Sequence, residues 1–295
     1  MKSFFDIRSY IEGVEKDSSL YDEKNFANRV EVMDQLEVLQ REGGQPDRLL
    51  LLQSRAEKVR SELEGIDTTL FFKIKAAIRT GGPTGEAFKR LVAGYVDFRA
   101  GCSGQQGEPG YDHLDIFING LIFSPAMPEQ TKALEPEMVY YQKTPARVIF
   151  ELVGKAHFRK EDVFVDLGSG LGQAAILVNL LAGVVVKGIE FEPAFCDYAR
   201  DCAAALNLSR VTFINVDARE ADYSEGTVFF MYTPFRGAIL RDVLEVLRKE
   251  SLRRKIKIIT YGPCTAEVAL ESWLEVVSGG GSDLYMPGVF SSFQG

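Results

Sequence analysis

Cysteine and histidine are scarce in this sequence. Four cysteines and two histidines occur among 295 residues, and no two cysteines form a CxxC pair. Zinc sites need cysteine or histidine at short, repeated spacings, so no metal site is expected. Scattered thiols without a pairing pattern are typical of proteins from a reducing compartment, and we therefore predict a cytoplasmic location.

Long apolar runs and a basic surplus are also missing. No stretch approaches the roughly 20 apolar residues of a transmembrane helix. The N-terminus, MKSFFD, lacks the pattern of a secretory signal, so we expect no membrane association. The formal net charge is −8, whereas proteins that grip nucleic acid usually carry basic surpluses that neutralise phosphates. A nucleic-acid partner is therefore not expected, and the basic stretch 248–257 is interpreted as a solvated helix end before a strand.

The first 135 residues have the periodicity of helices. Apolar residues recur at helical spacing in segments rich in Glu, Leu, Arg and Gln, and glycine or proline separates these segments. Predicted helices cover residues 26–40, 49–63 and 86–98, and predicted turns or loops cover 43–47, 81–85 and 101–110. The sequence does not decide the secondary structure of the apolar segment 111–123. We predict a helical N-terminal domain, residues 1–135, that covers the substrate side of the molecule.

The pattern changes after about residue 136. Short apolar runs alternate with helical segments, which is typical of βαβ units and a parallel sheet. Predicted strands cover 163–167, 184–189, 211–215, 227–232 and 256–261, with helices over 173–181, 193–206 and 237–250. Residues 283–293 predict a final strand, or a hairpin around Pro287 and Gly288. We predict an α/β fold with a doubly wound, mostly parallel, Rossmann-like sheet in a second domain, residues 136–295.

A glycine-rich bend follows the first predicted strand, in the sequence VFVDLGSGLGQ. The strand ends in Asp166, and Gly168, Gly170 and Gly172 follow at every second position. Ligands of open α/β sheets bind at the carboxyl ends of strands, and glycine lets the backbone approach a ligand, so we interpret the bend as a nucleoside site. The spacing GxGxG differs from the GxGxxG of dinucleotide enzymes, and no P-loop lysine is present. An acid before the glycines suits the ammonium and sulfonium of S-adenosylmethionine, although a turn without a ligand remains an alternative.

Two further acids end the next predicted strands. Glu190 lies 24 positions after Asp166, where a carboxylate can accept both ribose hydroxyls, a feature that NAD enzymes share. Glu192 is interpreted as the cap of the following helix. Asp217 is placed to accept a hydrogen bond from the adenine amino group, or is simply a loop acid.

The order DLGSGLG, GIE and a strand followed by aspartate resembles the class I, or seven-strand, methyltransferases. More narrowly, residues 136–232 are similar to the non-SET histone-lysine methyltransferase family, which has a DLGSGxGQ loop and an upstream Tyr-x-x-Thr element that closes over the cofactor. The resemblance implies a methyltransferase with S-adenosylmethionine as its cofactor. With the two acids above, the expected cofactor site comprises Tyr141, Thr144, Asp166, Gly168, Ser169, Gly170, Gly172, Gln173, Glu190 and Asp217. Thr144 and Pro145 also have the pattern of a helix start, with threonine as N-cap.

The sequence departs from that family on the substrate side. After the fourth predicted strand it has Tyr232, Thr233, Pro234 and Phe235, where the family has asparagine and aromatic residues. We expect the hydroxyl and carbonyl groups of the first three to orient the methyl acceptor and Phe235 to wall the pocket. The resemblance therefore covers the cofactor and the catalytic frame, without the histone substrate. His113 is interpreted as a surface or packing residue.

The predicted activity is methyl transfer to a protein side chain, possibly lysine, or to a small-molecule amine or hydroxyl. A non-catalytic module that binds S-adenosylmethionine is one alternative, and an NAD-linked oxidoreductase is another. The sequence leaves the acceptor and the oligomeric state open.

Overall fold

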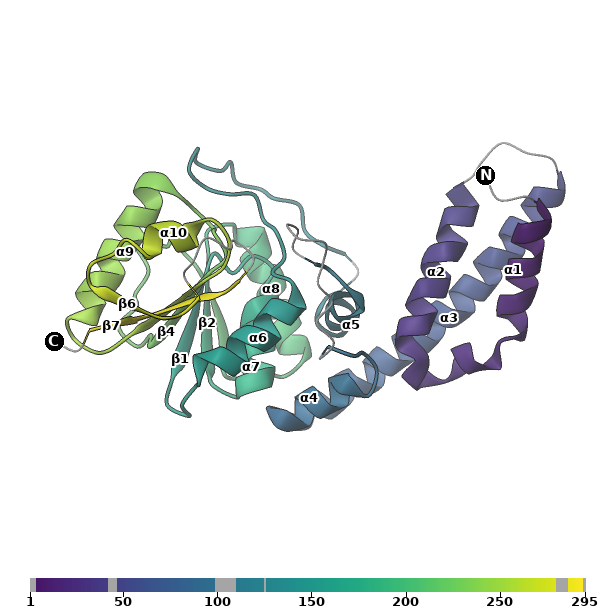
Figure 1. The fold of residues 1–295 in the computed structure, drawn as a ribbon, viewed down its shortest axis with the longest axis horizontal. Helices are drawn as coiled ribbons and strands as arrows, with labels where there is room; N and C mark the ends of the chain where they lie inside the picture. Colours follow the sequence, from purple (N-terminus) through teal and green to yellow (C-terminus); the bar gives the residue numbers. More distant parts are fainter. Residues whose placement is uncertain (1–3, 42–46, 99–109, 125, 280–285, 294–295) are drawn as a thin grey trace.

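In the computed structural model, residues 4–41, 47–98, 110–124, 126–279 and 286–293 are described. Figure 1 shows two parts: a bundle of three helices at the N-terminus, and a larger body built around one sheet. Helix α3 reaches from the bundle to the body. Within the described residues, no helix combines the length and apolarity needed to cross a membrane.

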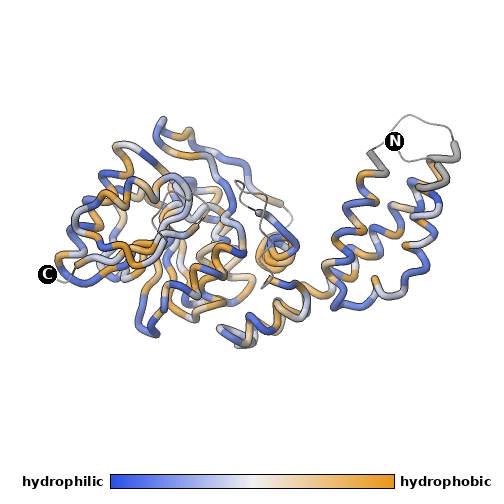
Figure 2. The backbone as a smooth tube through the Cα atoms, in the orientation of Figure 1, coloured by the Kyte–Doolittle hydropathy of each residue, from blue (hydrophilic) through white to orange (hydrophobic). Residues whose placement is uncertain are grey.

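The N-terminal bundle consists of α1 (Phe4–Lys16), α2 (Phe26–Arg41) and α3 (Asp47–Arg79), with two short 3₁₀ turns, η1 (Ser18–Tyr21) and η2 (Glu23–Asn25), between the first two. Apolar side chains from all three helices, including Ile11, Leu36 and Leu63, form a separate core. Figure 2 shows hydrophilic and hydrophobic residues interspersed along these helices.

The predicted helices are present, with different lengths. The segment predicted over 49–63 continues to Arg79, because the apolar spacing continues through Leu70, Ile74 and Ile78, which pack against the body. Helix α4 (Glu86–Ala93) is shorter than predicted and ends at Gly94. The undecided piece 111–123 forms α5 (His113–Ile122). The predicted turn at 43–47 and loop at 101–110 lie almost wholly outside the described residues.

The body contains a seven-stranded sheet with strand order β3-β2-β1-β4-β5-β7-β6. The strands are β1 (Val163–Leu167), β2 (Val185–Glu190), β3 (Val211–Asn215), β4 (Val228–Met231), β5 (Lys257–Thr260), β6 (Leu274–Ser278) and β7 (Gly288–Ser292). The first five are parallel, and β7 pairs antiparallel with both β5 and β6. The order reverses between β1 and β4, which places the switch point beside the glycine-rich bend.

Helices cover both faces of the sheet. One face packs on α4, α5, α6 (Ala146–Ala156), α7 (Gln173–Ala182) and α8 (Pro193–Ala205), and the other on α9 (Gly237–Ser251) and α10 (Cys264–Val268). Neighbouring strand residues alternate between the two cores, as Phe229 and Phe230 do, because side chains in a strand point to opposite faces. The doubly wound α/β prediction is confirmed. Helices α4 and α5 belong to the predicted N-terminal domain, but they pack in the core beside the sheet. The predicted domain boundary at residues 135/136 stays a prediction.

The C-terminal tail forms the predicted final strand, β7, and not the alternative hairpin. Pro287 and Gly288 do not form a hairpin turn: Gly288 opens β7, and β7 pairs with β6, which was not predicted. The side chains of Glu275, Val276 and Val277 are all exposed at the edge of the sheet, so β6 shows no alternation of apolar and polar residues. The basic stretch 248–257 follows the prediction, since α9 ends at Ser251 and β5 begins at Lys257.

Candidate active site

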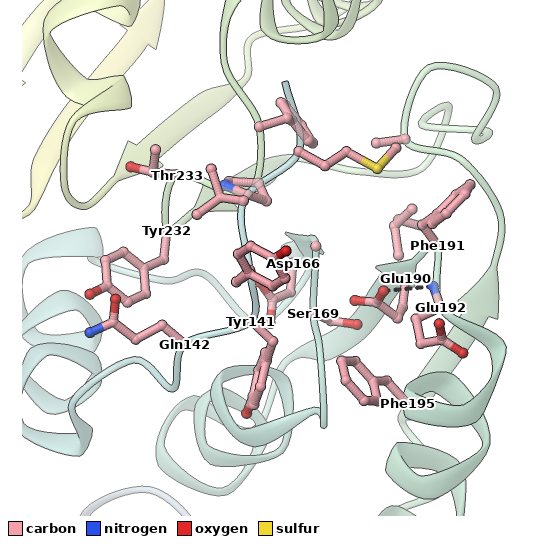
Figure 3. A pocket seen from close by; sticks show the side chains of 18 of the residues that line it. Tyr141, Gln142, Asp166, Ser169, Glu190, Phe191, Glu192, Phe195, Tyr232 and Thr233 are labelled. Atoms are coloured by element: carbon pink, nitrogen blue, oxygen red, sulfur yellow. Dashed lines mark hydrogen bonds between the residues drawn. The ribbon is translucent and has the colours of Figure 1, made fainter. Parts of the chain in front are cut away.

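A cavity of about 520 Å³ lies at the carboxyl ends of the parallel strands. Its floor includes residues from the ends of β1, β2, β4 and β5, and residues 126–144, called the strap below, cover it. The strap joins α5 to α6 without regular secondary structure. Figure 3 shows Asp166, Ser169 and Glu190 around the centre of this cavity, with Tyr232 to one side and Phe191 to the other. Its volume lies within the range of cofactor and small-molecule sites.

The glycine-rich bend has the geometry that only glycine adopts freely. Gly168, Gly170 and Gly172 all have positive φ angles, of 74°, 53° and 83°. The space that a Cβ atom would need is filled by protein in each case: by Pro234 at Gly168, by the Tyr141 ring at Gly170 and by Phe213 at Gly172. The packing of the protein therefore requires glycine at these positions, and the approach of the bend to a ligand stays a prediction. The three glycines make room for neighbouring side chains, and the cavity opens beside them.

Three buried polar atoms of the bend face this region without a hydrogen-bond partner in the described part of the chain. They are Asp166 Oδ2, Ser169 Oγ and Gln173 Oε1, and all three residues line the cavity. Buried polar groups are rarely left unpaired, because desolvation without a partner is costly. Removal from water, and next the charge of Glu190, raise the pKa of Asp166 to about 7. This environment favours a ligand that brings a positive charge and hydrogen-bond donors.

Glu190 ends β2 and is also buried. Its Oε2 accepts a hydrogen bond from the backbone N–H of Gly170 at 2.6 Å, and its Oε1 accepts one from the N–H of Glu192 at 2.8 Å. Burial raises the pKa of this carboxyl, and the backbone hydrogen bonds oppose that shift. The side chain is held rigidly at the cavity wall, and each oxygen retains a lone pair that can accept from a hydroxyl.

Asp217, two residues after β3, lines the far end of the cavity, with Val216 and Ala218 beside it. Its Oδ2 lies 2.7 Å from Arg219 Nη2, and this pairing lowers its pKa. Three apolar wall residues of this end, Phe191, Leu134 and Met138, were missed in the sequence analysis. Phe191 could have been predicted, because it directly follows Glu190 in the sequence. No local sequence pattern distinguishes the strap residues Leu134 and Met138.

The strap is fastened to the cavity walls. Glu192 caps α8, as predicted, through the N–H of Ala194, and it also accepts hydrogen bonds from the backbone N–H groups of Thr131 and Lys132 at 2.9 and 2.7 Å. Further along, the N–H of Val139 donates to the Pro234 carbonyl at 3.0 Å. The strap therefore closes one side of the cavity in this structure.

The strap ends with Tyr141 and Thr144, the predicted Tyr-x-x-Thr element. Both line the cavity. The prediction that Thr144 caps α6 is wrong: Pro145 occupies the N-cap position, and the N–H of Ala146 donates to Asp115 Oδ1 at 2.8 Å. The capping oxygen comes from α5, 31 residues away, so local sequence could not reveal it.

The four residues predicted to hold the acceptor all line the cavity. However, Thr233 uses its hydroxyl within the protein, donating to the Tyr261 carbonyl at 3.0 Å and accepting from the Cys264 N–H at 3.2 Å. The Pro234 carbonyl accepts from the strap, and Phe235 is only 5% exposed. These contacts make all three structural supports of the wall. The Tyr232 ring lies 4.9 Å from that of Tyr261.

Other residues at this end were not predicted. Tyr261, Gly262 and Glu267, which follow β5, line the same part of the cavity as Tyr232. His113 is not among the lining residues of the cavity. Its Nε2 lies 3.9 Å from Oε1 of Glu31 on α2, which agrees with its interpretation as a packing or surface residue.

Comparison with known proteins identifies the enzyme class. Residues 116–259, just under half of the chain, match the family described as "Histone methylation protein DOT1". Over these residues the chain is similar to the DOT1 family. It is therefore a class I methyltransferase whose cofactor is S-adenosylmethionine, and the predicted family, enzyme class and cofactor are confirmed. The alternative of an NAD-linked oxidoreductase is dropped.

Two solved methyltransferase structures are similar to about half of the chain. An RNA methyltransferase from Salinibacter ruber, in complex with S-adenosyl-L-homocysteine, is 24% identical, with 53% of this chain and 94% of that chain covered and a TM-score of 0.40. A methyltransferase from Aquifex aeolicus is 18% identical, with 50% and 92% covered and a TM-score of 0.41. At these TM-scores the likenesses carry no argument about function. No curated protein matched the chain.

Proposed function

We propose that this methyltransferase binds S-adenosylmethionine in the cavity at the carboxyl ends of β1, β2 and β3 and methylates a lysine side chain of a basic protein, with histones as the acceptor class. The observation that supports the cofactor site best is the set of unpartnered buried atoms of Asp166, Ser169 and Gln173 in that cavity. An amino acid ammonium and carboxylate would supply their missing partners.

The proposed assignments follow the cavity from one end to the other. Asp166 faces the ammonium, Glu190 accepts the ribose hydroxyls and Asp217 accepts the adenine amino group. The strap residues Tyr141 and Thr144 cover the methionine portion. The remaining members of the proposed site belong to the bend. Gly168, Ser169 and Gln173 line the cavity, whereas Gly170 and Gly172 are not among its lining residues and shape the turn through their positive φ angles.

The chain's contribution to the reaction is orientation. S-adenosylmethionine supplies an activated methyl group when it is bound. Aligning a nucleophile with such a group can lower a barrier by roughly 7–11 kcal/mol. The rings of Tyr232 and Tyr261 and the carboxylate of Glu267 line the acceptor end. Aromatic faces and a carboxylate attract a cationic side chain such as lysine.

Net charge supports a basic protein as the acceptor. The enzyme carries a formal charge of −8, and opposite net charges accelerate association between proteins. An acidic enzyme is poorly suited to gripping nucleic acid itself, so we propose recognition of the histone protein surface rather than of DNA. This proposal places the enzyme with chromatin rather than in the cytoplasm, and fractionation of expressing cells tests it.

Methyl transfer from labelled cofactor to purified core histones tests the proposal. We expect label in a histone lysine with the wild type, and at least tenfold less with Asp166→Asn or Glu190→Gln, because each removes one carboxylate charge from the cofactor site. Arg253→Met, on an exposed ion pair of the α9 end, is the matched control and should retain activity.

Calorimetric titration with S-adenosylhomocysteine separates the two parts of the proposal. Normal binding without transfer to any histone would contradict the proposed acceptor and favour a non-catalytic module. Undiminished binding by both carboxylate variants would contradict the proposed cofactor site.

A further inference from the structure

Arg219 connects two parts of the cavity that are far apart in the sequence. Its Nη2 lies 2.7 Å from Asp217 Oδ2 and 2.6 Å from Glu135 Oε1 of the strap. Its Nε and its backbone N–H both donate to Asp217 Oδ1, at 3.0 and 2.8 Å. The guanidinium thus holds both carboxylate oxygens of Asp217 and, at the same time, the strap.

These contacts orient Asp217. A guanidinium that meets a carboxylate with two parallel donors restricts the rotation of that carboxylate. Oδ1 already accepts two hydrogen bonds, whereas Oδ2 accepts one and keeps a lone pair available, and Asp217 lines the cavity. Arg219 therefore leaves Asp217 able to accept one more hydrogen bond, in a direction that is set in advance.

The contact with Glu135 sets the opposite wall. Glu135 lies between Leu134 and Met138 in the sequence, both of which line the cavity, and its carbonyl accepts from the Met138 N–H at 2.9 Å. Holding Glu135 therefore holds the apolar strap residues at a set distance from Val216 and Ala218. Leu134, Met138, Val216 and Ala218 give the cavity an apolar lining, and the Asp217 carboxylate lines the same cavity.

We propose that Arg219 is a positioning residue for adenine recognition. It aims the Asp217 carboxylate at the 6-amino group and fixes the strap over the base, so that the enzyme selects a 6-aminopurine cofactor. This inference depends on the proposed role of Asp217 in the cofactor site. Ion pairs that are partly exposed contribute little to stability, and the side chains of Arg219, Asp217 and Glu135 are 30%, 14% and 44% exposed. Selectivity should therefore depend on Arg219 more than folding does.

The experiment compares two ligands by calorimetry, with the full-length protein. One is S-adenosylhomocysteine, and the other is its purine-riboside analogue, which lacks the 6-amino group. We expect the wild type to prefer the first ligand by about tenfold or more, the usual effect of one hydrogen bond to a charged group. Arg219→Met should reduce this preference to less than threefold, with an unchanged melting temperature, and Arg219→Lys should retain an intermediate preference.

Three further variants separate the possible outcomes. Glu135→Gln should weaken both ligands alike and keep the preference, because the contact between Arg219 and Asp217 remains. Arg253→Met should change neither. A full preference in Arg219→Met, or an equal loss for both ligands, would overturn the role of Arg219. Asp217→Ala with a full preference would instead overturn the adenine assignment of Asp217, on which the inference depends.

Discussion

At the scale of single residues, the chemistry of the site depends on carboxylates that are withdrawn from water. Asp166 and Glu190 are 3% and 8% exposed, and burial raises the pKa of both. In the free protein this burial disfavours the ionised form of Asp166. A cationic ligand compensates for that cost, so the same burial that penalises the empty site increases its preference for an ammonium group.

The pKa of Asp166 predicts how ligand affinity depends on pH. With a pKa of about 7, Asp166 ionises between pH 6 and pH 8. The ligand ammonium pairs with the ionised form, so binding lowers this pKa, and affinity falls as pH falls below 7. We expect S-adenosylhomocysteine to bind about tenfold more tightly at pH 8 than at pH 6.

Calorimetry across this pH range checks the prediction, and Asp166→Asn should bind weakly with a flat profile. A variant that retained the wild-type profile would show that another group titrates. The free energy of unfolding of the ligand-free protein depends on pH in the opposite direction. It increases as pH falls below 7, because protonation of Asp166 removes a buried charge.

At the scale of elements, the strap has no regular hydrogen bonding of its own. It depends on side chains from the walls that it covers, and Glu192 contributes most: one oxygen accepts from two strap N–H groups while the other accepts from Thr131 Oγ1 and caps α8. The same residue thus begins a helix and secures the strap. A substitution that changes only one oxygen of Glu192 should therefore remove the hydrogen bonds to the strap and keep the cap of α8.

Glu192→Gln makes that change. One oxygen remains to cap α8, and an amide N–H₂ replaces the acceptor that faces the N–H groups of Thr131 and Lys132. We expect S-adenosylhomocysteine to dissociate about tenfold faster, because hydrogen bonds to a charged group are lost. Hydrogen exchange should become faster at these two amides. Thr131→Val, which removes only the hydroxyl, is the milder control. Unchanged exchange at both amides would contradict the fastening by Glu192.

At the scale of the whole molecule, the N-terminal bundle has its own core and supplies no cavity residue among those described, all of which lie within residues 130–267. The bundle is also held by a buried ion pair. Arg29, 0% exposed, donates to Asp67 Oδ1 at 2.8 Å and to the carbonyls of Leu20, Asp22 and Glu23. It thereby fixes the turns η1 and η2 onto α3.

Arg29→Ala tests whether the bundle is energetically separate. Removing one partner of a buried pair typically costs about 3–5 kcal/mol. We expect a loss of that order in the free energy of unfolding of the bundle, measured by denaturant titration, with unchanged affinity for S-adenosylhomocysteine. Arg55→Ala, in an exposed pair with Glu15, should leave the free energy of unfolding almost unchanged. Loss of ligand binding in Arg29→Ala would contradict this independence.

The sequence by itself determined most of the helices and strands of the sheet domain and the residues of the proposed cofactor site. The strands β1 and β3, the start of α7 at Gln173 and the acids at two strand ends could be predicted, because periodicity, glycine spacing and strand-end position are local properties of the chain. The same locality explains why β6 escaped prediction, since three consecutive exposed residues show no period.

Only the tertiary structure decided how the side chains of the site are used. It pairs Asp217 and Glu135 through Arg219, and it gives the hydroxyl of Thr233 to Tyr261 and Cys264. It also fills the space beside Gly168 with Pro234. Apart from Asp217 and Arg219, which are neighbours in the sequence, these partners are separated by tens of residues and come together only when the chain folds, so neighbouring sequence carries no record of them.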